Sequence, residues 1–123
     1  MKELTRAEEQ VMQILWKLGK GFVKDILEQF EEPKPAYNTV STVVRILEKK
    51  GFVGHRSFGK THEYHPQMSK NEYKTQSLHR LVKNYFGDSY REMVSFLAKD
   101  TDVDIRELEE VMNIIRDQIA KQK

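Results

Sequence analysis

Apolar side chains recur every three or four residues in two short N-terminal segments, which predicts two amphipathic helices. The first helix covers about residues 5–18 and begins at Thr5 and Glu8, a capping box that satisfies free amides at a helix start. The second covers about residues 22–30, and Phe22 is expected in a short extended segment because its side chain cannot cap a helix. The apolar positions of the first helix are Leu4, Ala7, Val11, Ile14, Leu15 and Leu18.

A third helix is predicted from about residue 36 to residue 50, between a break at Pro33 and Pro35 and a stop at Gly51. Its apolar stripe consists of Val40, Val43, Val44 and Leu47. At about 100° per residue, a polar face lies opposite this stripe. That face carries Asn38, Thr42, Arg45 and Lys49, with Ser41 beside it. Tyr37 lies nearer the apolar side and is expected to pack, as are Met12, Trp16 and Tyr64.

Two aromatic and β-branched stretches follow, residues 52–58 and 61–65, and they predict a pair of strands. Gly59 and Lys60 lie between them as a two-residue hairpin loop, in which glycine supplies a positive φ. The order helix, helix, helix, hairpin is that of a winged helix-turn-helix. We therefore expect a mainly α fold with a small β-hairpin, in which residues 1–68 form a winged-helix DNA-binding domain.

Residues 69–123 are predicted to form a helical dimerisation domain of three helices, each beginning with a serine or aspartate three residues before a glutamate. Three thin helices bury little apolar surface by themselves, so their stripes need a partner surface. We expect that surface to be a second copy of the chain; the alternative is that the stripes pack on the N-terminal domain. The expected dimerisation residues are Leu78, Leu81, Val82, Tyr85, Phe86, Ile105, Leu108, Met112, Ile115 and Ile119.

Composition narrows the class of protein. The 123 residues include no cysteine, which excludes disulfides, thiolate metal sites and cysteine nucleophiles. No apolar run is long enough to insert into a membrane and the N-terminus has no apolar signal region, so a cytoplasmic location is expected. The net charge is only +2, but residues 34–66 hold six basic and two acidic side chains. A local basic excess of this kind is typical of a polyanion partner.

The polar face of the third helix suits the major groove of duplex DNA. Asn can recognise adenine and Arg can recognise guanine with paired hydrogen bonds, and Ser or Thr tolerates either base. Arg56 and Lys60 of the hairpin are expected to reach the adjacent phosphate backbone. Two alternatives remain: the face is simply solvated, or the domain binds an acidic protein instead of DNA. Lys49 and Lys50 could equally be cations that favour a helix C-terminus.

The sequence gives little support for metal binding or catalysis. Asp100, Asp102 and Asp104 resemble the start of a calcium loop, but Ile105 and Val111 stand where that loop needs Gly and Glu. His62 and His65 are expected on opposite faces of one strand. No cofactor, metal site or catalytic motif is predicted, and an enzyme is not expected.

Several runs resemble the penicillinase and methicillin-resistance repressors, the BlaI/MecI/CopY family. They are Leu4-Thr5-x-Ala7-Glu8, Val11-Met12-x-Ile14-Leu15-Trp16, Tyr37-Asn38-Thr39-Val40-x-Thr42 and Glu48-Lys49-Lys50-Gly51-Phe52. The resemblance implies a homodimeric transcriptional repressor that binds a pseudo-palindromic DNA operator. It implies DNA contacts at the hairpin and at Asn38, Thr39, Ser41, Thr42 and Arg45.

The same resemblance bears on regulation. Some family members are inactivated by cleavage in the C-terminal helical region, triggered by a membrane sensor-protease. The matching candidate region here is Ser95 and Phe96, where the family pattern has Asn in place of Ser95. Copper-responsive members carry a cysteine motif, which this chain lacks. Phe22 replaces a hydroxyl residue that is common in the family and often contacts phosphate.

Overall fold

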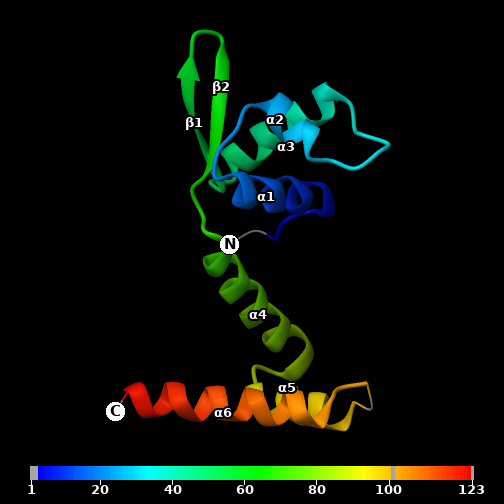
Figure 1. Ribbon diagram of the computed structural model, residues 1–123, viewed down its shortest axis with the longest axis vertical. Helices are drawn as coiled ribbons and strands as arrows, with labels where there is room; N and C mark the ends of the chain where they lie inside the picture. Colours follow the sequence, from blue (N-terminus) through cyan, green and yellow to red (C-terminus); the bar gives the residue numbers. More distant parts are fainter. Residues whose placement is uncertain (1–2, 101, 123) are drawn as a thin grey trace. The chain divides into compact units, whose positions relative to one another are not determined.

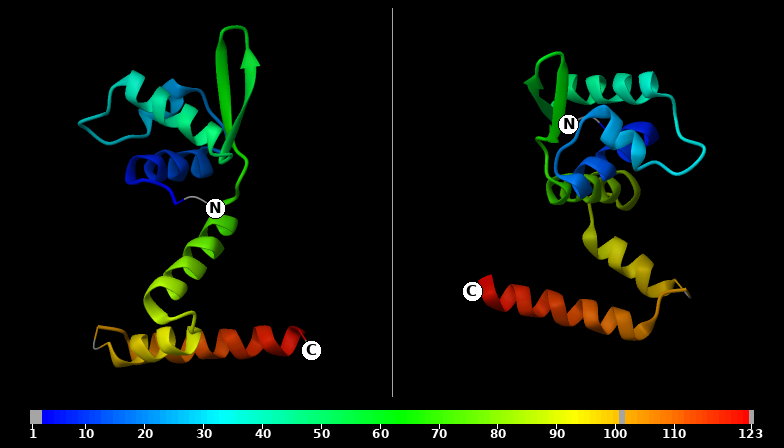
Figure 2. Two further views of the ribbon diagram at one scale, coloured as in Figure 1. Left: turned by 180° about the vertical axis from the view of Figure 1, so that it is seen from behind. Right: turned by 45° about the horizontal axis from the view of Figure 1, so that its top comes forward.

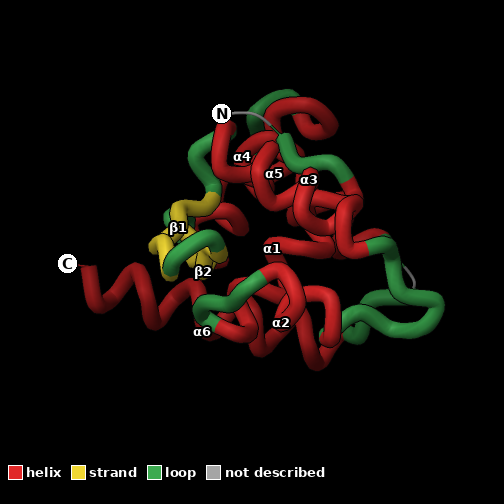
Figure 3. The backbone as a smooth tube through the Cα atoms, turned by 90° about the horizontal axis from the view of Figure 1, so that it is seen from above, coloured by secondary structure: helices red, strands yellow, loops and turns green. Residues whose placement is uncertain are grey.

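The computed structural model describes residues 3–100 and 102–122, and the chain is mainly helical with one two-stranded antiparallel sheet (Figures 1 and 3). This confirms the expected fold class. The chain divides into two compact units, one ending at Ser77 and the other starting at Leu78. The division lies beyond the boundary expected after residue 68, because the first turns of the fourth helix pack with the first unit. The elements are α1 (Arg6–Leu18), α2 (Val23–Glu28), α3 (Tyr37–Lys49), β1 (Val53–Phe58), β2 (Thr61–Pro66), α4 (Lys70–Phe86), α5 (Tyr90–Lys99) and α6 (Ile105–Gln122).

The helix starts follow the local sequence signals. At α1 the Glu8 amide donates to the Thr5 hydroxyl over 3.2 Å, and the Thr5 amide donates to the Glu8 carboxylate over 2.8 Å. Phe22 is extended, with φ −80° and ψ 164°, as expected for a residue that cannot cap α2. Its amide donates instead to the carboxylate of Asp25, 2.9 Å away. The predicted capping box and the predicted extended residue are both confirmed.

The core of the first unit lies between α1, α2, α3 and the base of the hairpin. Its fully buried side chains include Met12, Leu15, Ile26, Val40, Val44, Leu47 and Phe52. Tyr64 is buried as expected, and the indole of partly buried Trp16 donates to the Met68 carbonyl over 2.9 Å. The expected packing of Tyr37 is wrong: its side chain is 54% exposed, because it lies in the first turn of α3, before the core begins at Val40.

The hairpin is held in register and attached to the helices. Val53 pairs with Pro66 at its base and Phe58 with Thr61 at its tip, which leaves the predicted loop of Gly59 and Lys60. Gly59 has φ +62°, a conformation that glycine adopts without steric cost. The segment between α1 and α2 joins the sheet through Gly21. The long loop between α2 and α3 lies at the far end of this unit from the hairpin (Figures 1 and 2).

The second unit, from Leu78 onward, buries little apolar surface among its described residues. Val82 is buried within the chain, and the rings of Phe86 and Phe96 lie 5.7 Å apart between α4 and α5. No described residue of α6 is buried. Many large apolar side chains of this unit are therefore exposed, including Leu78, Leu81, Tyr85, Ile105, Met112, Ile115 and Ile119.

One buried ion pair fastens the start of α1 to the end of α3. Glu8 is only 4% exposed, although the helical pattern predicted that Ala7, which is exposed, would face the core. The Lys50 ammonium donates to both Glu8 carboxylate oxygens over 2.8 Å. Burial alone would raise the pKa of Glu8, but the hydrogen bonds from Lys50 and Thr5 outweigh it and hold the pKa below its ordinary 4.5. Lys50 is therefore occupied in the fold, and the ion pair should contribute to stability.

Replacing Glu8→Gln should lower the free energy of unfolding by about 2 kcal/mol at pH 7, because Lys50 loses its charged partner in a largely buried site. The difference from the wild type should shrink as the pH falls from about 4.5 through the lowered pKa of Glu8, because protonation removes the charge that Lys50 pairs with. Urea unfolding at several pH values measures it. Glu9→Gln, one position along on the exposed side of α1, is the matched control and should have little effect. A pH-independent difference would contradict the assignment.

Candidate nucleic-acid interface

The polar face of α3 points outward. Asn38, Thr42, Arg45 and Lys49 are exposed, and Ser41 is half-buried at the edge of the face. The Thr42 hydroxyl donates to the Asn38 carbonyl over 2.9 Å, and the Arg45 Nε donates to the Ser41 carbonyl over 3.4 Å. Both contacts stay within the helix, so the face is ordered by its own backbone while it remains open to a partner.

A groove of about 600 Å³ separates this face from the hairpin. None of the residues that line it is acidic, and three of them are Lys24, Arg45 and Lys60. We call it the cationic groove. A concave surface lined by one sign of charge concentrates the electrostatic field and attracts ions of the opposite sign. The full lining is Phe22, Val23, Lys24, Tyr37, Ser41, Arg45, Lys60, Thr61, His62 and Tyr64.

Seven of the ten groove residues were not among the predicted DNA contacts, and Lys24, Tyr37 and His62 show why. Lys24 lies on α2, in a stretch of the chain that is acidic overall. The net charge of that stretch therefore gave no indication of a DNA contact at Lys24. Tyr37 was expected to pack. His62 was considered only as a metal ligand. His65 lies three positions further along β2 and therefore on the opposite face of the hairpin, as expected.

The hairpin face toward α3 carries a cluster of aromatic and titratable side chains. The imidazoles of His55 and His62 stack in parallel with centroids 4.0 Å apart. His55 Nδ1 also forms a short contact with the carboxylate of Glu48 on α3. Burial, and then the charge of Glu48, raises the pKa of the Tyr64 hydroxyl, which therefore stays a neutral donor. These contacts tie the hairpin to α3 and set the width of the groove between them.

The other predicted hairpin contacts lie near its tip. Arg56 and Lys60 are both exposed, as an interface requires. The Arg56 guanidinium lies over the Phe58 ring, 5.3 Å from its centroid. Lys60 lines the cationic groove directly, whereas Arg56 is not among its lining residues.

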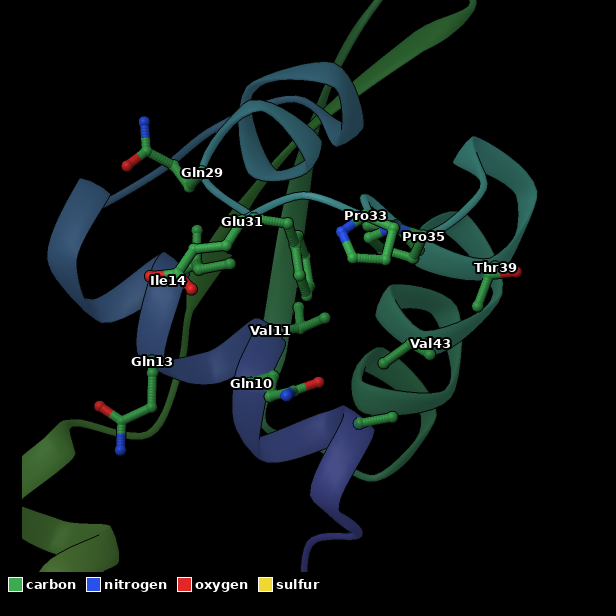
Figure 4. A pocket seen from close by; sticks show the side chains of 13 residues that line it. Gln10, Val11, Gln13, Ile14, Gln29, Glu31, Pro33, Pro35, Thr39 and Val43 are labelled. Carbon is green, nitrogen blue, oxygen red and sulfur yellow. The ribbon is translucent and has the colours of Figure 1, made fainter.

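Thr39 lies on a different side of α3. It lines a second hollow of about 580 Å³ between α1, α3 and the loop that joins α2 to α3, together with Val11 and Val43 (Figure 4). Thr39 is separated from Asn38 by about 100° around the helix, which accounts for the difference. The structure therefore does not bring Thr39 to the cationic groove. Asn38, Thr42 and Lys49 are exposed on α3 but do not line the groove either.

The predicted dimerisation and cleavage residues of the second unit differ in how far they are buried. Val82 is buried and Phe86 and Leu108 are partly buried, while the other expected dimerisation residues are exposed. Ser95 is half-buried and Phe96 is 61% exposed, and both lie within α5. They border a hollow of about 630 Å³ that Leu81, Tyr85 and Phe86 also line.

Over residues 3–100 and 102–122, no group of three or more histidine, aspartate or glutamate side chains is placed to hold a metal. Asp100 and Asp104 accept hydrogen bonds from nearby backbone amides, over 3.0 and 2.9 Å. None of the described helices is both long and apolar enough to span a membrane.

Three helices, a hairpin and a cationic groove between them define a winged-helix protein. The chain belongs to the penicillinase repressor family, whose model matches residues 4–117. This confirms the resemblance seen in the sequence motifs. The relatives are named as repressors and regulators, which are not enzyme names.

Two relatives align along almost their whole length. The methicillin resistance regulatory protein MecI of Staphylococcus aureus strain N315 is 24% identical over 114 residues, covering 92% of this chain and 93% of MecI. The penicillinase repressor of Bacillus licheniformis is 20% identical over 122 residues, covering 98% and 95%. Among solved structures, the DNA-binding domain of the repressor BlaI is 25% identical with a TM-score of 0.50, and covers 59% of this chain and 94% of that domain.

Proposed function

We propose that this protein is a sequence-specific DNA-binding transcriptional repressor. The observation that carries the proposal is the cationic groove, which lies beside the outward polar face of α3 and has no acidic lining residue. Membership of the penicillinase repressor family supports it. The function needs no cofactor and no catalytic site.

In this proposal α3 enters the major groove of the duplex. Asn38 and Arg45 contact base edges, with Ser41 and Thr42 as adaptable hydrogen-bond partners. Lys24, Lys60 and His62 follow the phosphate backbone along the cationic groove, where contacts supply affinity and orientation without reading sequence. Arg56 and Lys49 contact phosphates at the edges of the interface. For Thr39, the proposed contact rests on the family resemblance alone.

The protein acts as a homodimer in the cytoplasm. The exposed apolar side chains of α6 form a stripe at Ile105, Met112, Ile115 and Ile119, and large exposed apolar surfaces mark interaction sites. A second copy of the same stripe supplies the matching surface. A two-fold dimer presents two α3 helices and therefore prefers a pseudo-palindromic operator.

Relief of repression by proteolysis remains a candidate mechanism. Ser95 and Phe96 lie in α5, so a protease must unwind this helix before it can bind the backbone in extended form. The exposed ring of Phe96 offers the side chain that such a protease would recognise first. The sensor-protease would lie in the membrane, and the repressor itself would not insert.

Selection of bound duplexes from a random pool, followed by affinity measurements at several salt concentrations, tests the proposed function. Affinity should fall by orders of magnitude between about 50 and 200 mM salt, as phosphate contacts predict. Lys24→Ala should lower the slope of log affinity against log salt by about one. The control Lys17→Ala, on an exposed side of α1, should not change it. No enriched sequence, or a flat salt response, would favour the alternative of a protein-interaction module.

Arg45→Ala should weaken binding to the selected duplex by about 1–3 kcal/mol and relax base preference at one position, because the guanidinium would no longer contact a base edge. Repeating the selection with the variant measures both effects. Arg6→Ala on α1 removes an equal charge outside the cationic groove and should leave base preference intact. An unchanged base preference in Arg45→Ala would show that Arg45 does not contact a base edge.

Met112→Asp combined with Ile115→Asp should convert the dimer to monomers, since two carboxylates would be buried in an apolar interface. Analytical ultracentrifugation measures the mass, and affinity for the full operator should fall with it. Asn113→Asp with Ala120→Asp adds the same charge on the other side of α6 and should stay dimeric. A dimeric Met112→Asp/Ile115→Asp protein would show that the interface lies elsewhere.

A further inference from the structure

The tip of the hairpin is fastened to the start of α2 by two aromatic rings. We propose that Phe22 and Phe58 form an aromatic clasp that holds Arg56 in position for a DNA phosphate. The clasp makes Phe22 and Phe58 positioning residues, which act on DNA binding through Arg56. This inference rests on the proposed function and adds the means by which the hairpin is ordered before DNA arrives.

The three side chains lie next to one another in a row. The rings of Phe22 and Phe58 lie 5.8 Å apart at 64°, an edge-to-face arrangement. Arg56 lies over the Phe58 ring at 5.3 Å, within the range of a cation–π contact. Arg56 and Phe58 are two residues apart on β1, so they share one face of the hairpin. The contact therefore passes from the helices through Phe22 and Phe58 to the guanidinium.

The backbone around Phe22 is fixed independently of its ring. Gly21 exchanges two backbone hydrogen bonds with Tyr64 of β2, over 2.9 and 2.8 Å. The Phe22 amide donates to Asp25 over 2.9 Å. With its backbone held on both sides, Phe22 presents its ring to the hairpin tip from a defined place.

A packing role alone explains the clasp poorly, because the Phe58 side chain is 45% exposed and buries only part of its apolar area. An exposed Phe58 ring is expected if its role is to orient the Arg56 guanidinium. A guanidinium stacked on an aromatic face keeps its edge N–H donors free for phosphate. Ordering a long side chain before binding removes part of the entropy cost of association. The clasp should thus strengthen the Arg56–phosphate contact.

The first test needs no DNA. In the free protein, the Hδ protons of Arg56 should resonate upfield, because the guanidinium next to them lies over the Phe58 ring. Phe58→Leu should return them to ordinary positions, and Phe22→Leu, which keeps apolar bulk, should shift them part of the way. Unshifted Arg56 protons in the wild type would overturn the clasp and leave the proposed function untouched.

The second test is a double-mutant cycle on the duplex selected for the wild type. Phe22→Leu and Arg56→Ala should each weaken binding about three- to tenfold and lower the salt slope, and together they should weaken it no more than Arg56→Ala alone. Phe22→Tyr keeps the ring and should restore wild-type affinity and slope. Thermal unfolding of each variant shows that it is folded. Additive losses, or an unchanged slope in Phe22→Leu, would overturn the positioning role, whereas a wild type that binds no duplex would overturn the proposed function instead.

Discussion

The packing of Val40, Val44 and Leu47 into the core determines which face of α3 is exposed to solvent. A helix rotates as one body, so fixing three side chains on one face fixes every other residue of the helix. The stripe packs against α1 and the base of the hairpin, where Phe52 is fully buried. Asn38, Thr42 and Arg45 are outward as a consequence of this burial, and the face available to DNA depends on it.

A second constraint is the attachment of the hairpin. Three kinds of contact hold it: backbone hydrogen bonds between Gly21 and Tyr64, the contact of His55 with Glu48, and the ring pair at its tip. A two-stranded hairpin by itself is barely stable in water. With these contacts the hairpin keeps a defined distance from α3, so the cationic groove exists before any partner binds. Such preorganisation favours affinity, because less freedom is lost on association.

The sequence predicted the elements well because their signals are local. The capping residues Thr5 and Glu8, the loop at Gly59 and the apolar stripe of α3 need only neighbours within a few positions. The features that the sequence did not predict are contacts between residues far apart in the chain. The Glu8–Lys50 pair spans 42 residues, and no local pattern shows that a glutamate of α1 will be buried. Tyr37 and Lys24 fall in the groove because of how α2 and the hairpin pack, which helical spacing alone does not encode.

DNA binding by this protein depends on one surface, formed by α3, Lys24 and the hairpin. Its most direct measurement is a map of backbone amide NMR shifts as a selected duplex is added to ¹⁵N-labelled protein. The account predicts that the largest changes occur at residues 38–45, around Lys24 and at Lys60 to His62, while the hollow between α1 and α3 near Gln10 changes little. Changes concentrated at that hollow, with α3 and the hairpin unaffected, would contradict it.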